Sequence, residues 1–438
     1  MPLLREKSEP LWPDPPLPVT IGPLRRSLRM AFLGTAFLSC WLASYVVEPQ
    51  KFLYARSWSF ADPFCGLLFV VVVVLLITGH FRIDPPARWM FVYICAFFIS
   101  IAGNNTWDVG GTLNFLRTAV FGLTLYVLAR NCLCSAEDVG PFHLMCAVLG
   151  VAIALQGIFV VFVHWGEKFT NLLPVMGNMA NLMNAWGFVL VMCFTVAIFW
   201  WGQSLKSVLR AAVCGVLGIG IALSLSRTAY TCLALVLFLA VIGRRLKKSV
   251  KLAFLALAIG GFMWVTISQL SKNVPDATKF LEIKFDNYQA DLIDTRFNEL
   301  TIQPLLEWQE QTPEVWMIGD GMSEKHNLFI NCFWMTGIIG ALAMLAYEAS
   351  LFRVAARLRR STPEVAHAMG LTLLALVTIM FLDDFLTNLR NHSATVAYVF
   401  AVLAGCLSSD IVGQGRWGNH NGRIWFLVKK WQVTPRGL

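Results

Sequence analysis

The chain has 438 residues, 57% of them hydrophobic and only 14% charged, with a mean hydropathy of +0.63. Soluble domains carry about a quarter charged residues, so a soluble chain of this composition could not cover its surface with polar groups. The net charge of +9 does not indicate nucleic acid as a partner either, because no basic stretch is interleaved with aromatic residues in a soluble domain.

Residues 1–27 are rich in proline and polar residues and predict a disordered cytoplasmic tail without a cleavable signal peptide. Arg25, Arg26 and Arg29 then surround the start of the first apolar run. Basic residues collect on the cytoplasmic side of membrane helices, so these arginines place the N-terminus in the cytoplasm.

Apolar runs follow along the whole chain, and some of them, such as 62–79 and 229–243, approach the length that crosses about 30 Å of hydrocarbon. They predict an all-α polytopic membrane protein with about twelve transmembrane helices. The first nine form a membrane domain over 28–269 and the last three a second part over 326–410. The predicted spans are 30–47, 62–79, 88–103, 112–130, 140–164, 180–201, 209–225, 228–243, 250–269, 327–347, 366–385 and 392–409.

The basic residues predict the orientation of these spans. With the N-terminus inside, 24 of the 35 Lys and Arg residues fall on the cytoplasmic side, as the positive-inside rule requires. The loop 244–251 and the tail 411–438 are basic segments of that side. The tail also holds aromatic residues and predicts a segment that rests on the inner leaflet.

One external connection, 270–325, is far longer than the others, polar and mixed in charge. Loops of this length are usually functional or disordered. Apolar residues recur in it, at Phe280, Ile283, Phe285, Leu300, Leu305, Leu306 and Trp308. This recurrence predicts a partly helical cap over the membrane domain.

The 11 cysteines fall within apolar runs or in the short loop 130–138, a pattern that does not describe a disulfide framework. Cys132 and Cys134 have no second pair and no histidine cluster nearby, so they do not indicate a metal site. The external loops lack a D-x-D sequence, and the chain has no Walker A, H-E-x-x-H or G-x-S-x-G motif. The sequence therefore indicates no metal, no cofactor and no nucleotide hydrolysis.

Polar residues of the predicted spans gather at the external ends. Arg117 lies about one turn into its span and either faces the bundle interior or reaches back to the headgroups. Asn178, Asn181 and Asn184 share one face near the start of the sixth span. Such residues either form hydrogen bonds between helices or line a cavity that binds hydroxyl groups.

Arg227 lies in the external turn between the seventh and eighth spans, beside serine and threonine hydroxyls. The helix after it would point its positive dipole end outward, so an anion there would meet both a guanidinium and a helix N-terminus. The alternative is an interfacial arginine that contacts headgroups. Arg296, in the long loop, is by itself an ordinary surface arginine.

Lys325, His326 and Asn327 begin the tenth span. A helix dipole penalises an imidazolium at its N-terminus, and a neutral histidine is what a general base must be. The alternative is a lone interfacial histidine with a structural role. Asp383 and Asp384, at the end of the eleventh span, predict a salt bridge from one of them to an arginine of the cavity.

Several motifs occur in a particular order. Ser226, Arg227 and Thr228 open one span, Arg296 follows in the long loop with Trp308, Gly319 and Gly321, and His326 and Asn327 precede nine residues and a G-x-x-G at Gly337 and Gly340. In this order the motifs resemble the O-antigen ligase and polysaccharide polymerase superfamily of bacterial lipid-linked glycan transferases. The resemblance is strongest over 177–345. The two glycines of the G-x-x-G would let another helix approach closely.

The resemblance implies a membrane glycosyltransferase fold of the C type (GT-C) in the bacterial inner membrane, with its active site facing the periplasm. The donor would be a glycan on undecaprenyl diphosphate, and the acceptor a saccharide on lipid A-core for a ligase or on a lipid-linked repeat unit for a polymerase. Arg227 and Arg296 would bind the diphosphate, and His326 would be the essential histidine. The other candidate substrate-binding residues are Arg117, Asn178, Asn181, Lys325 and Asn327.

The rival class is a polytopic transporter or a flippase for lipid-linked oligosaccharide, because carriers also commonly have twelve spans. A carrier places its ionisable residues near the midplane and often repeats its halves. Here they lie at external helix ends and no matched halves occur, which favours glycan transfer. Trp186, Trp308 and Trp316 could then stack on sugar faces.

Overall fold

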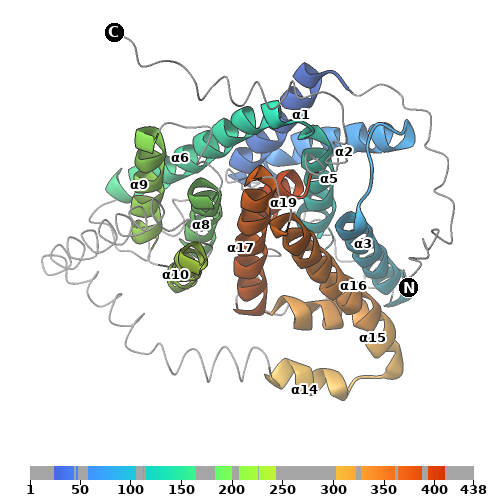
Figure 1. Cartoon of the computed structure of the whole chain (residues 1–438). Helices are drawn as coiled ribbons and strands as arrows, with labels where there is room; N and C mark the ends of the chain where they lie inside the picture. Colours follow the sequence, from blue (N-terminus) through green and yellow to red (C-terminus); the bar gives the residue numbers. More distant parts are fainter. Residues whose placement is uncertain are drawn as a thin grey trace, which may run out of the picture.

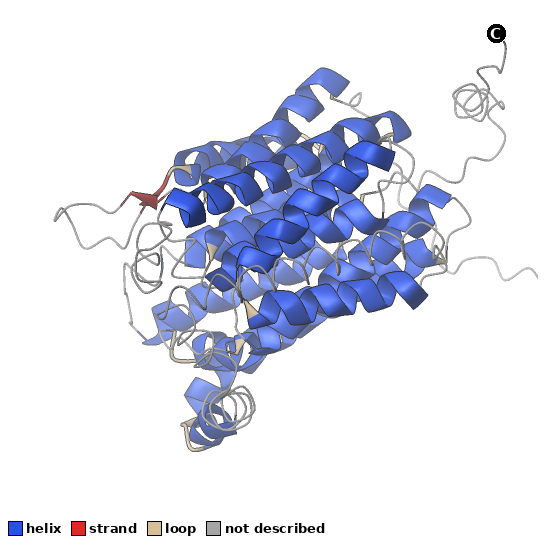
Figure 2. Ribbon diagram, turned by 90° about the vertical axis from the view of Figure 1, so that its left-hand side faces the viewer, coloured by secondary structure: helices blue, strands red, loops and turns tan. Residues whose placement is uncertain are grey.

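Helices make up nearly all of the structure, and several run side by side (Figures 1 and 2). The computed structural model describes residues 24–43, 46–47, 58–104, 112, 115–163, 183–199, 207–224, 226–242, 302–321, 327–360, 364–386 and 393–409. Within these ranges the only strands are β1 (Val46–Val47) and β2 (Trp58–Ser59), which pair antiparallel.

The helices follow the predicted spans. Each predicted span overlaps a helix except 250–269, which lies outside the described residues. The helices in chain order are α1 (Arg26–Leu42), α2 (Ala61–Ile77), α3 (Pro85–Asn104), the π-helix η1 (Leu116–Phe121), α5 (Gly122–Cys132), the 3₁₀ turn η2 (Ala136–Asp138), α6 (Val139–Val163), α8 (Met183–Phe199), α9 (Ser207–Leu223), α10 (Arg227–Ile242), α14 (Gln303–Gln309), α15 (Pro313–Ile318), α16 (Leu328–Arg359), α17 (Glu364–Leu386) and α19 (Ala394–Leu407).

Four of the described helices, α3, α6, α16 and α17, are long and apolar enough to cross a membrane. The helices α2, α8, α9, α10 and α19 are apolar but shorter. These features are those of an all-α membrane protein. The number of twelve spans and the GT-C fold stay predictions.

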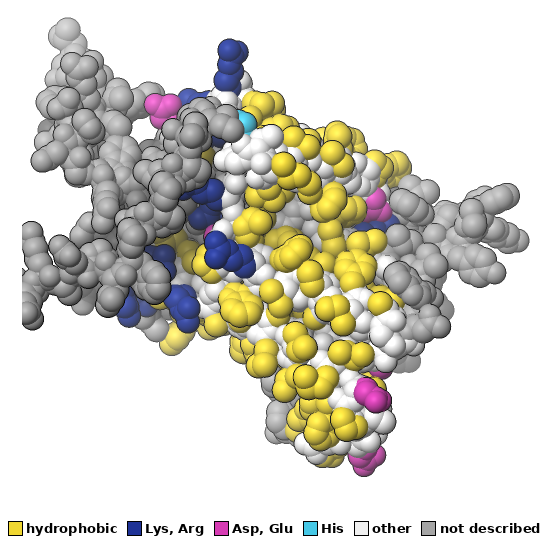
Figure 3. Space-filling view, turned by 90° about the vertical axis from the view of Figure 1, so that its right-hand side faces the viewer, with side chains coloured by type: hydrophobic (Ala, Val, Ile, Leu, Met, Phe, Trp, Pro, Cys, Tyr) yellow, Lys and Arg dark blue, Asp and Glu magenta, His cyan; other side chains and the backbone are white. Residues whose placement is uncertain are grey.

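Large apolar side chains cover the outer faces of the peripheral helices. Leu67 on α2, Phe91 on α3 and Phe159 on α6 are each more than half exposed. Figure 3 shows hydrophobic side chains over the middle of one face, with most of the Lys and Arg side chains toward one edge. Soluble proteins rarely expose contiguous apolar surface of this extent. Lipid tails are the solvent that suits such a surface.

The helices α8 and α19 form the buried centre of the bundle. Every residue of 185–199 in α8 and of 395–407 in α19 is buried. Both segments are apolar on all sides, which is typical of helices with neighbours all round. The neighbours of α8 are α6, α9, α10, α17 and α19, while α19 also packs against α1, η1, α5 and α17.

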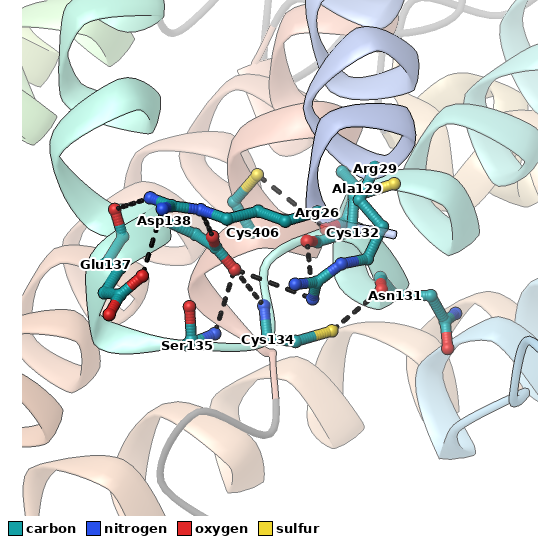
Figure 4. Close-up of polar contacts among 10 residues, drawn as sticks. All are labelled: Arg26, Arg29, Ala129, Asn131, Cys132, Cys134, Ser135, Glu137, Asp138 and Cys406. Carbon is teal, nitrogen blue, oxygen red and sulfur yellow. Dashed lines mark hydrogen bonds and ion pairs between the residues drawn. The ribbon is translucent and has the colours of Figure 1, made fainter. Parts of the chain in front are cut away.

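At one end of the bundle, Asp138 connects α1 to the turn between α5 and α6 (Figure 4). Its fully buried carboxylate accepts hydrogen bonds from Arg26 Nε at 3.0 Å and from the backbone N–H groups of Cys134 at 3.1 Å and Ser135 at 3.0 Å. Arg29 Nη1 lies 3.6 Å from the same carboxylate. These contacts fix the start of α1 against the start of α6.

Asp84 makes a second connection at this end. One carboxylate oxygen accepts from Ala87 N at 3.1 Å, which caps the start of α3, while the other contacts Tyr126 Oη at 2.8 Å and Arg130 Nε at 2.6 Å. Tyr126 also bonds to Ser408, 2.9 Å away, so α3, α5 and the end of α19 are joined.

We call the end that holds Asp84 and Asp138 the basic end. The exposed arginines there include Arg25, Arg26, Arg82 and Arg88. It brings together the start of α1, the α2–α3 turn and the α5–α6 turn, which the predicted topology assigns to one side of the membrane. That this side is the cytoplasm stays a prediction.

Labelling of introduced thiols from outside intact cells tests the orientation. A cysteine at Glu310, exposed after α14, should be modified by a membrane-impermeant reagent, and one at Arg359, exposed at the end of α16, should be spared. The native Cys134 is exposed at the basic end, so Cys134→Ser provides the background. Modification at position 359 with protection at 310 would show the opposite orientation.

Candidate functional site

The end of α17 that lies away from the basic end is the meeting point of α10 and α16. The rings of Phe329 on α16 and Phe381 on α17 have centroids 5.3 Å apart. On α10, Cys232 Sγ lies 4.0 Å from Ile379 O of α17. We call the first turns of α10 and α16 together with the last turn of α17 the α17 junction. It joins the start of α10, at Arg227, to the start of α16, at Asn327, a hundred residues later in the chain.

Two carboxyl groups of the α17 junction, those of Asp383 and Asp384, are fully buried. A buried carboxylate is costly unless it is paired and hydrogen-bonded. The predicted pairing with a cavity arginine such as Arg227 stays a prediction, because the side chain of Arg227 lies outside those described. The burial itself agrees with a polar interior at this end of the bundle.

The Ser-Arg-Thr motif forms the start of α10. Ser226 is the N-cap: its Oγ accepts from Ala229 N at 3.2 Å, and Arg227 is the first helical residue. The preceding turn is pressed against α8, since a Cβ on Gly187 would lie 2.4 Å from Ser224 Oγ. The predicted helix start at this motif is therefore confirmed, and an anion near Arg227 would meet the positive end of the α10 dipole.

Asn327 has a structural role at the start of α16. Its Oδ1 accepts from Phe329 N at 3.0 Å and from Ile330 N at 3.3 Å, which makes it the N-cap, and the residue is almost fully buried. Because Oδ1 of Asn327 already accepts these backbone hydrogen bonds, it is not open to a sugar hydroxyl. Asn327 thereby fixes where the helix begins immediately after His326 in the chain.

The glycines of the motif bring two backbones into contact. Gly319 and Gly337 have positive φ of 76° and 62°, where a side chain is strained. A Cβ on Gly337 would lie 2.3 Å from Met317 O, and one on Gly319 would lie 2.5 Å from Thr336 N. The helix α16 is kinked at Gly337, and the end of α15 packs into the kink.

The expectation that these glycines admit another helix is met at Gly337 by the end of the short helix α15. The expectation is wrong for Gly340, whose missing side chain leaves room for Thr336 of the same helix: a Cβ there would lie 1.9 Å from Thr336 Oγ1. The segment 313–321 is fixed to α16 by this contact and by a 2.7 Å hydrogen bond from Asp320 N to Trp334 O.

The described part of the predicted cap, 302–321, is helical and packs on α16. Trp308 stacks on Trp316 with centroids 5.4 Å apart and contacts Phe333 at 5.0 Å. Trp334 Nε1 donates to Pro304 O at 3.0 Å. The prediction of a partly helical loop is thus confirmed over this range.

Sugar stacking on Trp186 is ruled out by its position. The residue is 1% exposed in the centre of the bundle. Its indole N–H donates to Ile153 O at 3.0 Å. The predicted stacking fails because α8 packs against α6 and α9, and the indole fills the space against Gly157 of α6.

Arg117 lies inside the bundle on the π-helix η1. Its Nε donates to Asp62 Oδ2 at 2.9 Å, and both side chains are largely buried. The same carboxylate oxygen accepts from Ser59 N at 3.0 Å. Of the two predicted orientations, the Arg117 side chain therefore adopts the one that faces the bundle interior. The π-helix η1 packs on α19, and α19 packs on α17. Single π-helical turns are frequent at functional sites.

Neither Asp62 nor the π-helix was anticipated from the sequence. The candidate residues Asn178, Asn181, Arg296, Lys325 and His326 lie outside the described residues, as does the Arg227 side chain. Within the described ranges, no group of three or more His, Cys, Asp or Glu residues could hold a metal ion.

Comparison with models of known protein families and with curated proteins finds no match for the chain. The described fold is that of an all-helical membrane protein in which α10 and α16 both contact α17 near its end.

Proposed function

We propose that the chain is a metal-independent membrane glycosyltransferase. It moves a glycan from undecaprenyl diphosphate to a saccharide acceptor at the periplasmic face of the bacterial inner membrane. The acceptor is lipid A-core if the enzyme is an O-antigen ligase, or a lipid-linked repeat unit if it is a polymerase of O-antigen or exopolysaccharide. The observation that supports the proposal is that α10, which begins at Arg227, and α16, whose N-cap is Asn327, both contact α17 near its end.

The proposed chemistry is displacement at the anomeric carbon. The bond between this carbon and the diphosphate oxygen breaks while the acceptor hydroxyl oxygen bonds to the carbon. Arg227 and Arg296 bind the leaving diphosphate through bidentate contacts, and the dipole of α10 adds to its stabilisation. His326 accepts the hydroxyl proton as the new bond forms.

The other residues support binding. Asn178, Asn181 and Lys325 contact the sugars, and Asn327 holds the start of α16 behind His326. Arg117, paired with Asp62, shapes the polar wall on the α19 side. The buried Asp383 and Asp384 orient the arginine of the junction.

A reconstituted assay tests the proposal. The purified chain in nanodiscs, given an undecaprenyl-diphosphate glycan and an acceptor, should form product and continue to do so in excess chelator. Activity that disappears with chelator and returns with Mg²⁺ or Mn²⁺ would show that a metal rather than the arginines stabilises the leaving group.

The flippase alternative has a different outcome in the same system. Movement of the glycan lipid between the leaflets without any transfer product would favour it. Ionisable residues at helix ends, as at the α17 junction, are not the midplane sites that carriers use.

A further inference from the structure

The helices α3 and α16 run antiparallel along each other on one side of the molecule (Figure 1). At the end away from the basic end, Asn104 Nδ2 donates to Gly319 O at 2.7 Å, and Gly319 contacts the backbone beside Gly337. Helices rise about 1.5 Å per residue. Arg88, sixteen residues before Asn104, therefore lies level with Arg353, sixteen residues after Gly337, and both are exposed.

The outer face of α16 changes from apolar to basic toward this level. Ile338, Leu342 and Leu345 are exposed at helical spacing. The same stripe reaches Arg353 about two turns after Leu345 and ends about two turns later at Arg360, and both arginines are exposed. A lipid lying along this face would have its tails against the leucines and its headgroup at the arginines.

The outer face of α3 has the same polarity. Val92 and Ile99 are exposed on one stripe, and Arg88 is exposed one turn before Val92. Trp89 beside it is 43% exposed, and tryptophan is enriched at the headgroup level of membranes. Figure 3, which views this side, shows Lys and Arg along the edge of the apolar zone.

These arginines are available for a ligand. The side chains of Arg88, Arg353 and Arg360 form no ion pair or hydrogen bond with any part of the chain that the structure describes. By contrast, Arg26 and Arg130 at the same end are paired with carboxylates. Among the described residues, these three guanidinium groups therefore stand unpaired on α3 and at the end of α16.

We infer that the basic end of α3 and α16 binds the headgroup of an anionic phospholipid. The phosphate lies between Arg88 and Arg353, where guanidinium groups offer bidentate hydrogen bonds. The acyl chains follow the exposed apolar stripes of the two helices, and Trp89 lies at the interface. Basic pockets between membrane helices on one leaflet are the usual receptors for such headgroups. This site is separate from the α17 junction, so it does not rest on the proposed function.

Lipid retention by the purified full chain tests the site. Detergent-solubilised protein is mixed with phosphatidylglycerol or phosphatidylcholine of equal chain length, and bound lipid is counted by native mass spectrometry. The parent should retain phosphatidylglycerol in preference. Each arginine near an anionic headgroup contributes about fivefold in affinity. Arg88→Gln and Arg353→Gln should therefore each weaken retention about fivefold, and the double variant roughly thirtyfold.

Arg25→Gln is the matched control, because Arg25 is exposed at the same end but precedes α1, away from α3 and α16. It should leave retention unchanged. Equal binding of the two lipids by the parent would overturn the inference, as would parent-like retention in the double variant. So would an equal loss in Arg25→Gln and Arg88→Gln, since only the overall charge would then matter. Unfolding temperatures in detergent confirm that the variants are folded.

Discussion

Replacing Arg227 or Arg296 by lysine should lower the rate of glycan transfer by roughly a hundred- to a thousand-fold. A lysine ammonium is a compact charge and cannot reproduce the planar two-donor fork of a guanidinium. Losing such a contact to a charge that develops in a desolvated site costs about 2.7–4 kcal/mol. The measurement is the single-turnover rate at saturating donor in nanodiscs. Arg25→Lys, at the basic end, is the matched control and should keep the parent rate.

His326→Ala should stop transfer for a different reason, because it removes the proposed base and leaves the diphosphate site intact. Donor affinity separates the two roles. The arginine variants should bind undecaprenyl diphosphate more weakly than the parent, and His326→Ala should bind it about as well. Equal donor binding across all variants would show that the arginines do not bind the diphosphate. Full activity in His326→Ala would show that His326 is not the base.

Folding must be checked in the same variants. Arg227 follows the buried N-cap Ser226, and two buried aspartates lie on the neighbouring α17. Removing a partner from a buried charge can cost 3–5 kcal/mol and would mimic lost catalysis. The lysine variants keep the positive charge, which is why they are preferred to alanine.

The positions of the helices follow from hydropathy alone where a segment is apolar on all sides. The centre helices α8 and α19 are such segments, and their burial needs no knowledge of neighbours. The residue at which α16 ends could not be predicted from hydropathy alone. The predicted span stops at 347, but the helix runs to Arg359, because Leu351, Ala355 and Leu358 continue a buried stripe between the exposed arginines.

The contacts of the candidate site depend on tertiary geometry that a sequence does not carry. The G-x-x-G spacing is visible in the sequence, but only the structure shows that the end of α15, at Met317, fits the kink at Gly337. The pairing of Arg117 with Asp62 spans 55 positions and uses a π-helical turn, for which the sequence has no signal. The start of α10 was predictable, because serine before an apolar run is a common N-cap.

Asp138→Ala should destabilise the protein by about 3–5 kcal/mol, the range for removing one partner of a buried charged group. The fully buried carboxylate contacts Arg26 and Arg29 and accepts from the backbone N–H groups of Cys134 and Ser135. Arg26 is half exposed, so its charge can return to water. The loss of stability therefore comes mainly from the largely buried Arg29 and from the N–H groups of Cys134 and Ser135, which are left without this acceptor.

Asp138→Asn distinguishes these contributions, because an amide oxygen can still accept from the backbone N–H groups but carries no charge for Arg29. We expect the stability of this variant to lie between those of the parent and of Asp138→Ala. Glu137→Gln is the matched control: Glu137 is the adjacent residue, it also contacts Arg26, and its side chain is 69% exposed. Exposed pairs contribute about 0–1 kcal/mol, so its effect should stay in that range. The free energy of unfolding in mixed micelles measures all three. A loss in Glu137→Gln as large as in Asp138→Ala would show that overall charge at the basic end, rather than the buried carboxylate, holds α1 against α6.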